Sequence, residues 1–139
     1  MTKPARLFLD IAVRTVVLVA GDWVYREIAD HSPLGDDALG AGLLDFALVI
    51  AFAGLWAALD GTRQGLRRTT AVWVSVGVLG GIATTVVFNL MEAPLDTGVL
   101  RADLGDTAPF LAGLVIVPAL VAAALGAVVR RAAAPRPTR

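Results

Sequence analysis

The chain has 139 residues, of which 57% are hydrophobic and 17% are charged, and its formal net charge is zero. A soluble domain of this length could not bury so much apolar surface, because small domains remove only a limited share of their area from water. The balanced charge argues against nucleic-acid binding, and the lack of cysteine excludes disulfides, thiolate metal sites and cysteine nucleophiles. The composition predicts an all-α integral membrane protein with one domain, residues 1–131.

Four apolar segments are long enough to cross a bilayer as helices: residues 6–26, 39–59, 70–91 and 108–129. The last two carry no charge, and about 22 residues at 1.5 Å each span about 33 Å, more than the ~30 Å hydrocarbon core. The second segment is interrupted only by Asp45. The first carries Asp10, Arg14 and Asp22, so we expect its neighbours to stabilise it. These charges also disfavour a cleaved signal peptide. The pattern predicts a four-transmembrane-helix bundle with short loops.

Turn and capping residues predict where the helices end. Residues 60–68 form the predicted second loop, and Gly61 there suits a helix C-terminus. Asp106 or Thr107 is the predicted cap of the fourth helix, with Pro109 in its first turn. The basic, proline-containing residues 132–139 are predicted to be a disordered cytoplasmic tail.

The basic residues predict the orientation of the chain. Only Arg26 and Arg101 fall on one side of the four-pass arrangement. Because cytoplasmic loops are enriched in Lys and Arg, we expect both termini in the cytoplasm of a cell (inner) membrane. The preference for arginine over lysine indicates a bacterial source with a GC-rich genome. The basic residues on the cytoplasmic side are Lys3, Arg6, Arg63, Arg67, Arg68, Arg130, Arg131, Arg136 and Arg139.

Small residues spaced four apart predict close helix packing. Gly77 and Gly81 form such a pair in the third segment, and Ala119 and Ala123 form one in the fourth. Close approach of backbones drives helix association in lipid, where the hydrophobic effect between helices is lost. We favour packing within one chain, with a homo-oligomer contact as the alternative.

Asp10 and Arg14 are a candidate intramembrane ion pair, because residues four apart share a helix face. An ionisable group in the apolar layer costs about 2.5–3.5 kcal/mol and persists when it is paired or used. We favour a structural pair, and the alternative is a proton or substrate relay.

Asp22, Asp45 and Asn89 are a candidate intramembrane polar site. Counting the helix rise places all three at a similar depth, roughly 6 Å below the outer edge of the core. If they converge, two carboxylates and an amide share a proton or hold a cation. The alternative is that Arg26 neutralises Asp22 and that Asp45 lies at the interface.

The sequence has no nucleotide, catalytic or metal motif, and His31 lacks the fixed spacing of a metal ligand. We therefore expect a non-enzymatic protein without cofactors: a structural or accessory subunit of a membrane complex. Its expected partners are the lipid bilayer and another membrane protein or a second copy. The alternative is a small proton- or cation-coupled transporter or channel that uses Asp22 and Asp45. A lipid or quinone enzyme is a weaker third reading.

Overall fold

The computed structural model describes residues 3–32, 38–91 and 95–133, and the fold there is all-helical, as predicted. The predicted tail lies outside these residues from position 134 on, while residues 132 and 133 belong to the last helix. Four helices follow one another along the chain: α1 (Lys3–Asp30), α2 (Ala38–Gln64), α3 (Leu66–Met91) and α4 (Thr97–Ala133).

Three of these helices are long and apolar enough to cross a membrane: residues 39–64 of α2, all of α3 and all of α4. The first helix is not among them, although it has 28 residues. Its length is sufficient, at about 1.5 Å per residue, but its charged residues lower its hydropathy. How α1 accommodates those charges is therefore the central question of this fold.

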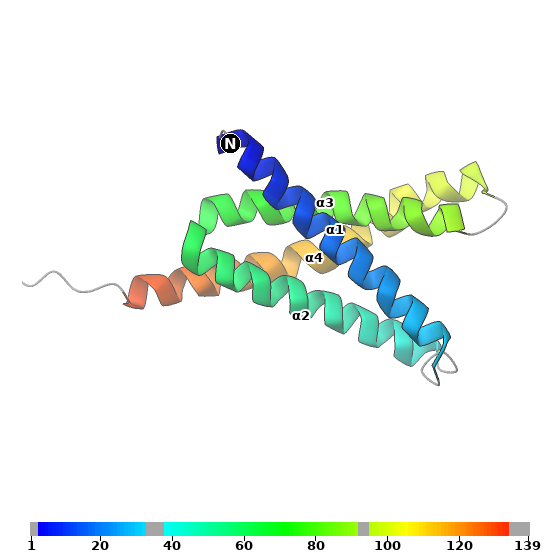
Figure 1. Ribbon diagram of the computed structural model, residues 1–139, viewed down its shortest axis with the longest axis horizontal. Helices are drawn as coiled ribbons and strands as arrows, with labels where there is room; N and C mark the ends of the chain where they lie inside the picture. Colours follow the sequence, from blue (N-terminus) through cyan, green and yellow to red (C-terminus); the bar gives the residue numbers. More distant parts are fainter. Residues whose placement is uncertain (1–2, 33–37, 92–94, 134–139) are drawn as a thin grey trace, which may run out of the picture.

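The second and third helices pack on α4, which runs behind both and contacts them along much of its length (Figure 1). The first helix lies on the opposite side, crosses in front of α3, and contacts mainly α3 and to a smaller extent α2. The start of α1, the α2–α3 turn and the end of α4 lie at the same end of the molecule (Figure 1). The shared core of α1, α2, α3 and α4 includes Leu18, Ala57, Trp73 and Ala119.

The predicted helix ends at Gly61 and Asp106 are wrong. The second helix continues to Gln64, and Gly65 provides the left-handed residue, with φ of 84°. The fourth helix begins at Thr97, so Asp106, Thr107 and Pro109 lie inside it. The Asp96 carboxylate accepts a hydrogen bond of 2.7 Å from the Gly98 amide and so caps this helix earlier than predicted.

The small residues serve packing within the chain. A Cβ on Gly77 or Gly81 would collide with α4 near Ala112, and one on Gly126 would collide with the backbone of Ala58 in α2. Gly61 lies equally close to the backbone of Ala123, which explains why a glycine occurs within α2. Close helix approach therefore fixes α4 against α2 and α3. Ala119 and Ala123 are fully buried.

We predict that Gly126→Ala destabilises the folded chain by about 1–3 kcal/mol, because the added methyl group must displace α2 or α4. Gly113→Ala on the same helix is the matched control, since a Cβ there meets nothing within 4 Å. Thermal unfolding followed by circular dichroism in detergent micelles measures both. Equal melting temperatures for the two variants would show that this contact does not limit stability.

Candidate functional site

The first helix contacts its neighbours through two clusters of ionic side chains. The Asp60 cluster consists of Asp10, Arg14, Asp60, Arg68 and Trp73, and the Asp45 cluster consists of Asp22, Arg26 and Asp45. Each contains one acid–base pair of α1 spaced four residues apart. The two clusters lie toward opposite ends of α1.

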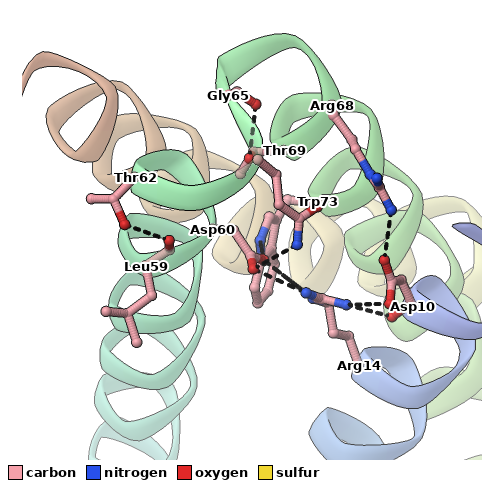
Figure 2. Close-up of polar contacts among 10 residues, drawn as sticks. Asp10, Arg14, Leu59, Asp60, Thr62, Gly65, Arg68, Thr69 and Trp73 are labelled. Carbon is pink, nitrogen blue, oxygen red and sulfur yellow. Dashed lines mark hydrogen bonds and ion pairs between the residues drawn. The ribbon is translucent and has the colours of Figure 1, made fainter. Parts of the chain in front are cut away.

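The Asp60 cluster is built on a buried ion pair between α1 and α2 (Figure 2). Arg14 Nη2 donates to both Asp60 carboxylate oxygens at 3.0 Å, and Nε donates to Oδ2 at 3.3 Å. Both residues are only 6% exposed. Trp73 Nε1 of α3 donates to the same carboxylate at 3.1 Å, so three helices meet at Asp60. A buried pair needs such additional hydrogen bonds, because desolvation otherwise outweighs the Coulomb attraction.

The predicted pair of Asp10 and Arg14 is present as a weaker part of this cluster. Arg14 Nη1 lies 3.7 Å from the Asp10 carboxylate and donates to the Asp10 backbone oxygen at 2.9 Å. The Asp10 carboxylate is closer to Arg68 Nη2, at 3.0 Å (Figure 2). The Arg14 guanidinium also lies 5.0 Å from the centre of the Trp56 ring, within cation–π range.

Sequence reasoning did not identify Asp60 and Trp73. Asp60 fell in the predicted loop because α2 was expected to end near Gly61, whereas the helix continues for another turn. The sequence did hold a signal for this pair. Counting the rise per residue from the arginine-rich ends of the first two helices places Arg14 and Asp60 toward the same side of the bundle. The burial of Trp73, which is 0% exposed, had no such signal.

The Asp45 cluster joins α1, α2 and α3 through Arg26. Its guanidinium lies 3.5 Å from Asp22 Oδ2 and 3.7 Å from Asp45 Oδ2, and it stacks 3.9 Å above the Phe88 ring of α3. Among the described residues, Asp22 Oδ2 and Asp45 Oδ1 are buried without a hydrogen-bond partner. The contacts are thus longer and less complete than those of Asp60.

Two neighbouring cavities border Asp45. One has a volume of about 250 Å³ and lies between α1 and α2, with Asp22 and Asp45 in its lining. The other, of about 300 Å³, is lined by Arg26 and Asp45 on the side nearer the α1–α2 connection. Because Asp45 borders both cavities and is 3% exposed, its carboxylate is buried yet has open space beside it.

The structure brings Asp22 and Asp45 together but places Asn89 elsewhere. Asn89 Nδ2 donates to Asp103 of α4 at 2.9 Å and to the Thr85 backbone oxygen at 3.1 Å. Consecutive helical residues are rotated by about 100°, so Phe88 faces α1 while Asn89 faces α4. The amide therefore strengthens the α3–α4 contact.

The described residues include no group of three or more His, Cys, Asp or Glu side chains that could hold a metal ion. His31, which follows the end of α1, is exposed, and its Nδ1 lies 2.8 Å from the Glu27 backbone oxygen in the last turn of that helix. No family model, curated protein or solved structure matches the chain. The chemistry that the geometry offers is the pairing of buried charges and, at Asp45, the binding of a proton or a cation.

We predict that Asp60→Asn destabilises the chain by about 3–5 kcal/mol, because it removes the main counter-charge of the buried Arg14 guanidinium and leaves only the Asp10 carboxylate at 3.7 Å. The double variant Arg14→Met, Asp60→Leu is expected to be more stable than Asp60→Asn, since it removes both charges. Arg68→Gln is the control, because that half-exposed pair is worth about 0–1 kcal/mol. Chemical unfolding in micelles compares the three, and a double variant less stable than Asp60→Asn would contradict this account.

Proposed function

We propose that the chain is an integral membrane protein that crosses a bilayer four times with both termini in the cytoplasm. The apolar character of α2, α3 and α4 supports three of the crossings. The fourth, by α1, is supported by the direction of its side chains: Phe8, Val16 and Ile28 are mostly exposed, while Arg14 is buried. An outer apolar face suits contact with lipid.

The ionic clusters support this placement of α1 energetically. A charge left alone in the apolar layer costs about 2.5–3.5 kcal/mol on insertion scales. Arg14 meets Asp60, and Arg26 lies between Asp22 and Asp45, so α1 shares its charges with α2. The helix would thus enter the bilayer as part of the bundle rather than alone.

The distribution of arginine supports the orientation. Arg67 and Arg68 at the start of α3, and Arg130 and Arg131 at the end of α4, lie at the end of the molecule where α1 begins (Figure 1). Positive charge concentrates on the cytoplasmic side of membrane proteins. This end of the bundle is therefore proposed to face the cytoplasm.

Single cysteines test the topology, because the chain has none of its own. We expect an impermeant thiol reagent added to intact cells to label His31→Cys and Thr97→Cys. It should label Ala5→Cys, Leu66→Cys and Ala132→Cys only after the membrane is permeabilised. Labelling of Ala5→Cys in intact cells would show that α1 does not cross.

We further propose that the protein is a non-catalytic accessory subunit that packs against a helix of another membrane protein. One observation carries this proposal: an apolar groove of about 780 Å³ runs between α2 and α4 on the bundle surface. Small residues line it, including Ala51, Gly54, Gly113 and Ala122, and a Cβ on Gly113 meets nothing within 4 Å. Small residues on an open face let a further helix approach closely in lipid.

A tagged chain, extracted gently from its native membranes, tests the subunit role. We expect it to migrate well above its 14.4 kDa mass together with another membrane protein in constant ratio. Gly113→Leu should fill the groove and release that protein, whereas Gly105→Leu, at an exposed position of the same helix, should not. A chain recovered only alone or only with copies of itself would overturn the proposal.

A second candidate function is a small proton- or cation-coupled transporter. The carboxylates of Asp22 and Asp45 favour it, because each has a buried oxygen that accepts no hydrogen bond within the described part of the chain. The first helix bears both Asp22 and Arg14. A change of charge in either ionic cluster would therefore alter the forces that hold this one helix in place.

A further inference from the structure

The cleft between α1 and α2 at the Asp45 cluster has the features of a small binding site. Its volume is about 250 Å³, and its lining is mostly apolar. Leu18 and Asp45 are buried at its floor, while Val17, Leu48 and Phe52 at its rim are about half exposed. The cleft is therefore open at the side of the bundle and closed toward the core.

The floor presents two carboxylate oxygens that accept no hydrogen bond within the described chain, although Asp22 Oδ2 lies 3.5 Å from Arg26 Nε. Asp45 Oδ1 has no hydrogen-bond partner, and the side chain is only 5% exposed, so little water can reach it. Asp22 Oδ2 is likewise a buried atom without a hydrogen-bond partner. A buried acceptor without a donor carries a desolvation penalty of about 1–3 kcal/mol, more for a charged group. A ligand that donates hydrogen bonds here would remove that penalty.

The charge of the cluster selects a cation. When both carboxylates are ionised they face one guanidinium, which leaves one negative charge uncompensated. Arg26 lies 3.5 Å and 3.7 Å from the two acids, beyond ideal hydrogen-bond distance. Among the described residues no third acidic, histidine or cysteine side chain joins the two carboxylates, so the cluster offers few protein ligands to a divalent metal ion. A primary ammonium group has three donors and one charge, which matches the unpartnered oxygens.

The size and lining of the cleft define the rest of the ligand. An apolar cavity of about 150 Å³ suffices to hold benzene. The cleft can therefore hold a single ring with a short chain against Val49 and Phe52. The Tyr25 hydroxyl donates to the Ala41 backbone oxygen at 2.7 Å and fixes one wall between the two helices.

We propose that this cleft binds a small amphipathic amine, with its ammonium group on Asp45 and Asp22 and its apolar body along the walls. The open rim lets such a molecule enter from the side, where an amphipathic compound accumulates in a bilayer. The site lies between α1 and α2, apart from the groove between α2 and α4. The inference rests on the proposed membrane placement and does not depend on the subunit role.

Binding of phenethylammonium to the purified full chain in a neutral detergent tests the proposal by calorimetry, with empty micelles subtracted. We expect saturable binding, and we expect Asp45→Asn to weaken the affinity at least about tenfold, because that is the effect of losing one charge-assisted hydrogen bond. Asp106→Asn, an exposed acid of α4, is the matched control and should bind as the unmodified chain does. The uncharged isostere 2-phenylethanol should show no saturable binding.

A second variant keeps the test decisive if Asp45→Asn does not fold. Gly21 lines the cleft and a Cβ there meets nothing within 4 Å, so Gly21→Leu should fold and block the site. Gly105→Leu, equally unobstructed on α4, should leave binding unchanged. Binding that survives Gly21→Leu, that is equal for the amine and the alcohol, or that does not exceed empty micelles would overturn the proposal.

Discussion

A guanidinium group is stable in an apolar interior only when its charge and its donors are satisfied, and Arg14 meets this condition through Asp60. The two residues belong to different helices, and Trp73 of a third helix donates to the same carboxylate. Replacing Arg14 or Asp60 leaves the other buried without its main counter-charge, which costs more free energy than a site that never held the two charges. The position of α1 on the bundle follows from this constraint, because α1 lacks the hydropathy of its neighbours.

The bundle is held by two different kinds of contact on its two sides. On one side α4 approaches α2 and α3 so closely that the helices meet backbone to backbone at Gly61, Gly81 and Gly126. That contact is van der Waals in origin and depends on the absence of a side chain. On the other side α1 is joined to α2 and α3 by charged and polar groups, with less backbone contact. The first helix is thus the element whose position responds most to a change of charge.

The two ionic clusters differ in how fully their groups are paired. In the Asp60 cluster the arginine makes direct hydrogen bonds of 3.0 Å and the carboxylate is surrounded by donors. In the Asp45 cluster the arginine lies farther from two acids, and open space borders the buried carboxylate. Complete pairing suits a structural role, whereas incomplete pairing beside a cavity suits binding. This contrast within one helix separates the part of α1 that holds the bundle from the part that can take a ligand.

The sequence alone determined the all-helical fold and the number of helices, because hydropathy and helical spacing are local properties, but it placed Asp60 in a loop that the structure makes part of α2. It also placed Asp22 and Asp45 at one depth, and they do share Arg26. Only the tertiary structure decided which faces meet. It turned Asn89 toward Asp103, gave Arg14 the partner Asp60, and used Gly61 for contact with Ala123. Depth follows from the helix rise, whereas rotation about each helix axis is set by packing between helices, which no single segment encodes.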